Sequence, residues 1–267
     1  MMLKRLLLFT VTCLLFVSCS DDPSTFTDEP PELPPVTSMD VNMSTLTGST
    51  HAKSATTQSN DHYIQAVFRA GIIKKVIDTN LLTPKNLLMA AGDTVAQLND
   101  KQQWEWNYSY TANTGDFAVR LVAERVASSI VNWSFFVTAD HLELENHLLF
   151  GGTTKNGGQQ GTWTHNSLQD PENAQQLSEI NWSIPEEEQV ELRLDIFSDR
   201  SVAAGSYIDY SVDGADKSVE YYDAGEDTIT IIAWNADTKA GSVIAPDINS
   251  GEKACWDEQQ ENVSCSE

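Results

Sequence analysis

The sequence predicts a mainly β (α+β) domain, a meander of about ten antiparallel strands that forms a curved sheet or open barrel, packed by two N-terminal helices. Polar and apolar residues alternate in segment after segment between residues 102 and 245. The gaps between those segments are short and rich in turn residues. Apolar residues at helical spacing come before them, between residues 61 and 99. A two-sheet β-sandwich is the alternative architecture.

Two amphipathic helices are expected before the strands. In the first, at residues 61–78, Asp61 can cap the amino end. Its apolar residues recur at helical spacing: Ile64, Val67, Phe68, Ile72 and Val76. Thr83-Pro84 is a second start signal, because proline is favoured at the first helical position. The second helix is therefore expected at residues 84–99.

The clearest strand lies at residues 190–196, where Glu191, Arg193 and Asp195 separate four apolar residues. Turn sequences such as Asp213-Gly214 join successive strands and are too short for a crossover helix, which predicts antiparallel neighbours. About ten strands in one flat sheet would curl or split, so we expect strong curvature. The glycine-rich run at residues 151–161 joins two strand-like segments and is interpreted as a hairpin loop.

The first nineteen residues have the pattern of an export signal. Lys4 and Arg5 precede an apolar run at residues 6–17. That run would form about 18 Å of helix, too short for a hydrocarbon core of about 30 Å. We therefore expect a signal peptide at residues 1–18.

The end of this segment, Phe16-Val17-Ser18-Cys19, resembles the lipobox of bacterial lipoproteins, although the family prefers Leu where Phe16 stands. The resemblance implies that Cys19 receives a diacylglycerol thioether and that the new amino group is acylated, for example with palmitate. Ser20-Asp21-Asp22 resembles the sorting and export signal of Gram-negative outer-membrane lipoproteins that face outward. An ordinary signal peptide in which Cys19 is incidental is the alternative.

Residues 19–59 are expected to form the lipidated cysteine and a disordered tether, because they combine five prolines with a Ser/Thr-rich run and lack sustained periodicity. A tether of about 40 flexible residues would have an end-to-end distance of roughly 35 Å. The pattern changes near residue 61, so a single globular domain is expected at residues 60–267.

The composition restricts the partners. The formal charge is −23, from 16 basic and 39 acidic residues. A polyanion is repelled by nucleic acid and by anionic lipid head groups, so the membrane is expected to be reached only through the lipid anchor. Hydrophobic residues make up 40% of the chain, which is enough for a packed core.

Two cysteines remain for the domain, Cys255 and Cys265, since Cys13 leaves with the signal peptide and Cys19 takes lipid. In an oxidising compartment these two are expected to form a disulfide. In the chain-entropy model it would contribute roughly 2–3 kcal/mol.

Metal and cofactor sites are not expected. His141, Glu143, Glu145 and His147 would share one strand face, but the first and last would lie about 20 Å apart, which favours a solvated face. Acidic residues crowd the turns near residues 209–227, without the spacing of an EF-hand.

An aromatic stripe is the candidate ligand-stacking site: Trp104, Trp106, Tyr108 and Tyr110. It could stack on sugar rings, contact an apolar ligand in a concave cavity, or form the buried face of a strand. The core interpretation is favoured.

The chain lacks the Gly-x-Ser-x-Gly and His-Glu-x-x-His motifs, so no catalytic residue is assigned. We expect a non-enzymatic binding or structural module on an outer-membrane lipoprotein, exposed at the cell surface. One alternative is a carrier of lipid or another apolar ligand, since helices over a curved meander resemble the half-barrel of the periplasmic lipoprotein carrier family. Another is a surface glycan-binding protein or glycan hydrolase.

Overall fold

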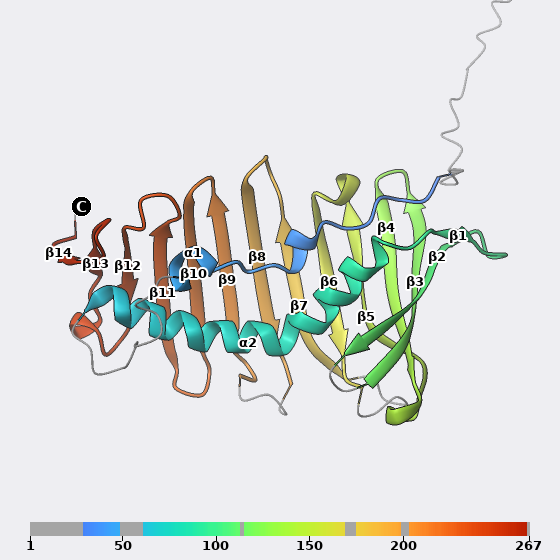
Figure 1. Ribbon diagram of the computed structural model, residues 1–267, viewed down its shortest axis with the longest axis horizontal. Coiled ribbons are helices and arrows are strands. Elements are labelled where there is room, and N and C mark those ends of the chain that lie inside the picture. Colours follow the sequence, from blue (N-terminus) through green and yellow to red (C-terminus); the bar gives the residue numbers. More distant parts are fainter. Residues whose placement is uncertain (1–28, 49–60, 113–114, 169–174, 199–202, 266–267) are drawn as a thin grey trace, which may run out of the picture.

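The computed structural model describes residues 29–48, 61–112, 115–168, 175–198 and 203–265. These residues form one 14-stranded antiparallel sheet whose strands follow one another in chain order (Figure 1). The predicted mainly β, antiparallel meander is therefore confirmed. The estimate of about ten strands was too low, and the described residues form neither two stacked sheets nor a closed barrel.

Strands pair only with their neighbours in the chain. Their bounds are β1 Gln97–Leu98, β2 Trp104–Ala112, β3 Gly115–Ala127, β4 Ile130–Ala139, β5 Leu144–Lys155, β6 Gln160–Asn166, β7 Gln176–Ser183, β8 Gln189–Ile196, β9 Tyr207–Asp213, β10 Asp216–Asp223, β11 Thr228–Asn235, β12 Gly241–Ile244, β13 Ala254–Trp256 and β14 Asn262–Val263. The strands that the sequence missed, β1, β13 and β14, have two or three residues each, too few to show an alternating pattern. Such short strands at both sheet edges also limit pairing with other chains.

One long helix, α2 (His62–Ala91), lies across the strands on one face of the sheet (Figure 1). The side chain of Asp61 accepts a hydrogen bond from the Ile64 amide at 3.1 Å, as a helix cap does. The predicted break at Thr83-Pro84 is wrong, because Pro84 lies inside the helix and is buried.

Proline removes one backbone donor and bends a helix, and α2 changes direction part-way along its length (Figure 1). The bend keeps its apolar side on the twisted sheet, so burial outweighs the lost hydrogen bond. The predicted second helix also extends too far, because α2 ends before Gly92 and β1 follows.

Residues 29–48, which we call the strap, lie beside α2 on the same face (Figure 1). The sequence assigned them to the tether. The structure instead folds them into a short 3-10 helix, η1 (Val36–Met39), and a single helical turn, α1 (Ser44–Thr47). Met39 and Leu46 are 1% and 2% exposed and belong to the hydrophobic core. The scattered apolar residues of the strap are enough to dock it, although they follow neither period.

The strap also supplies hydrogen-bond partners to the sheet. The indole of Trp163 donates to the Ser38 hydroxyl at 3.1 Å, and that of Trp234 donates to the Thr45 hydroxyl at 2.9 Å. The hydroxyl of Tyr210 donates to a strap carbonyl at 3.1 Å. Buried polar groups are costly when unpaired, so these contacts explain how large amphipathic side chains can fill the core.

Three glycines make room for the tryptophans on this covered face. Gly152 lies opposite both Trp133 and Trp163 in the sheet register, Gly161 opposite Trp182, and Gly241 opposite Trp234 and Trp256. A methyl group on Gly152 would come within 2.6 Å of the Trp163 ring. The glycine-rich run interpreted as a loop therefore contributes Gly152 and Gly161 to strands.

Candidate functional site

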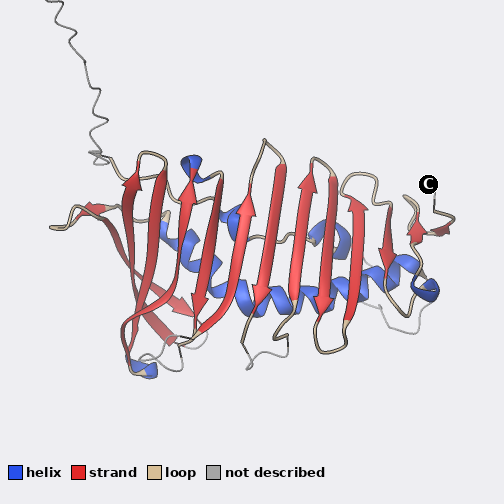
Figure 2. Cartoon of the chain, turned by 180° about the vertical axis from the view of Figure 1, so that it is seen from behind, coloured by secondary structure: helices blue, strands red, loops and turns tan. Residues whose placement is uncertain are grey.

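Within the described residues, neither α2 nor the strap covers the opposite face of the sheet (Figure 2). Because side chains alternate along a strand, the half of each strand that does not face the core lies here. On most strands this half is largely polar, whereas β11 presents Ile229 and Ile231. On β8, for example, Leu192 and Leu194 point into the core while Glu191 and Arg193 line the other side. We call this surface of the described residues the open face.

Register places polar residues in rows that cross the strands. In the first row each polar residue lies directly opposite the next: Asn132, Thr153, Thr162, Asn181, Arg193, Asp209 and Glu220. The apolar Ile231 lies opposite Glu220 and ends this row. A second row lies beside it: Lys155, Gln160, Ser183, Glu191, Ser211 and Ser218. Residues of both rows line a groove of about 900 Å³ that extends from β5 to β11. This groove is our candidate site.

Hydrogen bonds between neighbouring strands hold several groove side chains in place. The Thr162 hydroxyl donates to the Asn181 side-chain oxygen at 3.1 Å, and the hydroxyls of Ser211 and Ser218 are 2.8 Å apart. The Ser183 hydroxyl donates to Glu191 at 3.3 Å. These hydrogen bonds constrain the side chains of the groove wall.

Arg193 is the centre of the charged part of the groove. Its guanidinium donates to Asp209 at 2.8 Å and to Asp195 at 3.0 Å, and it lies 4.0 Å from the centre of the Tyr207 ring. Partial burial raises the pKa of Asp209, and the adjacent Arg193 opposes that rise. Tyr207 donates to Glu220 at 2.8 Å. Each of these carboxylates thus has a donor beside it.

The aromatic stripe points to the covered face rather than to the groove. Trp106 is 4% exposed. The hydroxyl of Tyr108 donates to the Leu87 carbonyl of α2 at 2.6 Å, and that of Tyr110 accepts from Asn86 at 3.2 Å. Burial raises the pKa of Tyr108. Trp104 packs against the same core. The four residues therefore lie on the buried face of β2, as the favoured interpretation of the stripe predicts.

The histidine and carboxylate candidates do not converge. His141 lies in η3 (Asp140–Leu142) against Phe117, with ring centres 5.3 Å apart. His147 is buried and bonds to the Ser167 carbonyl at 2.9 Å. Glu143 and Glu145 are exposed. No group of three or more histidine, cysteine or acidic side chains in the described ranges is arranged to hold a metal ion.

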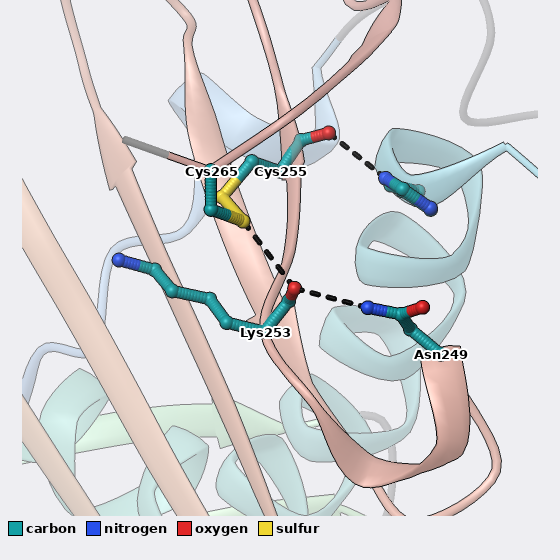
Figure 3. The surroundings of a disulfide bond; sticks show 5 residues. Asn249, Lys253, Cys255 and Cys265 are labelled. Carbon is teal, nitrogen blue, oxygen red and sulfur yellow. Dashed lines mark hydrogen bonds between the residues drawn. A yellow bond between two sulfur atoms is a disulfide. The ribbon is translucent and has the colours of Figure 1, made fainter. Parts of the chain in front are cut away.

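Cys255 and Cys265 form a disulfide, with their sulfurs 2.09 Å apart (Figure 3). The carbonyl of Lys253 lies 3.3 Å from the Cys265 sulfur and accepts a hydrogen bond from Asn249 at 3.2 Å. His62, the first residue of α2, bonds to the Cys255 carbonyl at 2.8 Å. The disulfide thus joins the last strands where α2 begins, far from the groove.

The signal peptide, Cys19 and the parts of the proposed tether outside the strap, residues 19–28 and 49–59, lie outside the described residues. None of the helices that the structure describes combines the length and hydropathy needed to cross a bilayer.

The chain matches no protein-family model, and no curated protein and no solved structure matches it either. The site must therefore be argued from its own geometry.

The sequence analysis missed the groove residues Thr162, Asn181, Asp209 and Glu220. Each was visible as the polar half of an alternating strand, which is the pattern of any solvated surface. What distinguishes them is that seven strands align them into rows, and that register is set by every intervening turn. The succession of alternating segments without a crossover helix between them was the one available signal.

Proposed function

We propose that the protein is a non-enzymatic binding module that is anchored by lipid to the bacterial outer membrane and displayed at the cell surface. The observation that carries the binding role is the groove on the open face. Alternate residues of the same strands fill the core, while those facing the groove are mostly polar, with Ile231 as the exception, and several are hydrogen-bonded to one another. The anchor rests on the resemblance of Phe16-Val17-Ser18-Cys19 to a lipobox.

The alternative of an apolar-ligand carrier has less support. A carrier needs room between helix and sheet. Much of this interface is filled by large side chains that are almost fully buried, among them Trp133, Trp163 and Leu88. The pocket between α2 and strands β10 and β11 has a volume of about 390 Å³, less than half that of the groove. The groove faces away from α2 and is lined largely by polar side chains. Native mass spectrometry of the whole protein should accordingly show no co-purifying lipid.

Substitution of the lipidated residue tests the anchor. Cys19→Ala should abolish incorporation of labelled palmitate and release the protein from the membrane fraction. Cys13→Ala is the matched control, because it changes a cysteine of the apolar run that is removed, and it should leave both properties intact. Retained labelling and attachment in Cys19→Ala would contradict the proposal.

Protease treatment of intact cells tests the orientation. Outward display predicts that the protein is digested while periplasmic proteins survive. Protection in intact cells, followed by digestion after the outer membrane is opened, would place the domain in the periplasm.

A further inference from the structure

We propose that the groove binds a neutral, linear, polyhydroxylated chain, a glycan strand, laid across strands β5–β11. This inference rests on the proposed binding role of the open face and names its ligand class. Four features of the groove carry it: its length, its lining, its order and its charge.

The length and direction of the groove suit an extended polymer. Its lining residues come from seven consecutive strands, β5 to β11. At about 4.8 Å between strands, the six intervals span about 29 Å. A chain lying across the strands would meet a new side chain about every 4.8 Å, so contacts would accumulate with ligand length.

The lining suits hydroxyl groups. Five lining residues present hydroxyls whose oxygens can accept from a ligand: Thr153, Thr162, Ser183, Ser211 and Ser218. Most of their protons are already donated to neighbouring side chains on the same face. The amides Gln160 and Asn181 lie in the same two rows. A ligand rich in hydroxyls can donate to these oxygens and accept from an amide such as Gln160, whereas an acyl chain can do neither.

The order of the lining limits the entropy lost on binding. Asn181 accepts from Thr162 and donates to Glu179 at 3.1 Å, so its amide is fixed on both sides. Arg193 is fixed by two carboxylates. Groups that are already held in place lose little freedom when a ligand arrives.

The net charge of the groove lining disfavours anionic ligands. The groove lining contains two cations, Lys155 and Arg193, and three anions, Glu191, Asp209 and Glu220. Arg193 already bonds to two carboxylates, so it has little capacity left for a ligand carboxylate or sulfate. A polyanionic glycan would meet net negative charge, and a neutral one would not.

The test is affinity of the full lipidated protein in detergent for defined oligosaccharides. The neutral probes are the hexasaccharides of cellulose, laminarin, amylose and chitin with their disaccharides, and the anionic probe is polygalacturonate. We expect at least one neutral hexasaccharide to bind at least about tenfold more tightly than its disaccharide, because the groove spans about 29 Å. Absence of binding by every neutral probe, or preference for polygalacturonate, would overturn the inference.

Ser211→Trp is designed to fill the groove from its second row, and Ser109→Trp is the matched control. Both serines are exposed on the open face, but Ser109 lies on β2, outside the groove. The groove variant should weaken hexasaccharide binding at least about tenfold, and the control should not. Asn181→Ala, which removes a fixed amide without adding bulk, should weaken binding about three- to tenfold, the effect of one neutral hydrogen bond. Unchanged affinity in both groove variants would contradict the site.

A photo-crosslinking residue at position 211 in intact cells separates this inference from the proposed function. Crosslinks to glycan support both. Crosslinks to a protein, with no oligosaccharide binding, overturn the glycan inference and leave the binding role. Absence of any crosslink and of any oligosaccharide binding counts against both.

Discussion

The covered and open faces of the sheet are built from alternate residues of the same strands, yet they differ in what holds their side chains. On the covered face, tryptophans lie over glycines and bond to the strap, so volume is critical. On the open face, small hydrogen-bonded polar groups form rows with space above them. In a sheet covered on one side only, packing on the covered face can supply most of the free energy of folding. Residues on the other face can then be substituted with little loss of stability.

The largest effect is expected where the covered face has least room. Gly152→Ala places a methyl group within 2.6 Å of the Trp163 ring and closer still to the Thr162 carbonyl. Backbone cannot move aside easily, so the free energy of unfolding should fall by about 3 kcal/mol or more. Chemical denaturation measures this loss. Gly71→Ala is the control, because nothing lies within 4 Å of its Cβ and the helix should gain about 0.5–1 kcal/mol.

The strap should prove to be part of the covered face rather than a tether. Leu46→Ala removes a side chain that is 2% exposed, and it should lower the free energy of unfolding by about 2–5 kcal/mol. Leu82→Ala, on α2 but 51% exposed, should change it by less than about 0.5 kcal/mol. Urea unfolding measures both changes. Equal, small effects of the two substitutions would show that residues 29–48 do not pack in the core and belong to the tether.

Acid should weaken the covered face through His165. Burial lowers the pKa of His165 from 6.5 to about 4. Above pH 6.5 neither the folded nor the unfolded state binds this proton. As the pH falls toward 4 the unfolded state takes it up first, so up to about 3 kcal/mol of stability is lost in that window. In His165→Gln the free energy of unfolding should depend less on pH between 6.5 and 4. An unchanged slope would show that other groups cause the acid sensitivity.

The smallest effect is expected on the open face. Thr162→Ala removes an exposed hydroxyl that bonds to Asn181, and it should change the free energy of unfolding by less than about 0.5 kcal/mol. Thermal unfolding checks this directly. A loss comparable to that of Leu46→Ala would show that the rows serve stability, and it would remove the contrast between the two faces.

The sequence predicted the elements whose residues carry a local period. The alternation from Trp104 to residue 245 located the long strands, and Asp61 marked the start of the helix. Pro84 led to a wrong prediction of a helix start. Local propensity disfavours proline inside a helix, but packing against the sheet keeps the helix continuous there. The strap was missed because its apolar residues obey no period. The groove was missed because register, which no single strand encodes, brings Asn181, Arg193 and Asp209 together.

With the proposed lipid anchor at Cys19, docking of the strap would limit how far the domain can lie from the bilayer. Ten residue steps separate Cys19 from Glu29, the first described residue, and a fully extended chain covers at most about 35 Å in that distance. The strap enters beside β4 (Figure 1), so this end of the sheet would stay near the lipid head groups. The protein would then act at short range, on molecules within the immediate envelope of its own cell.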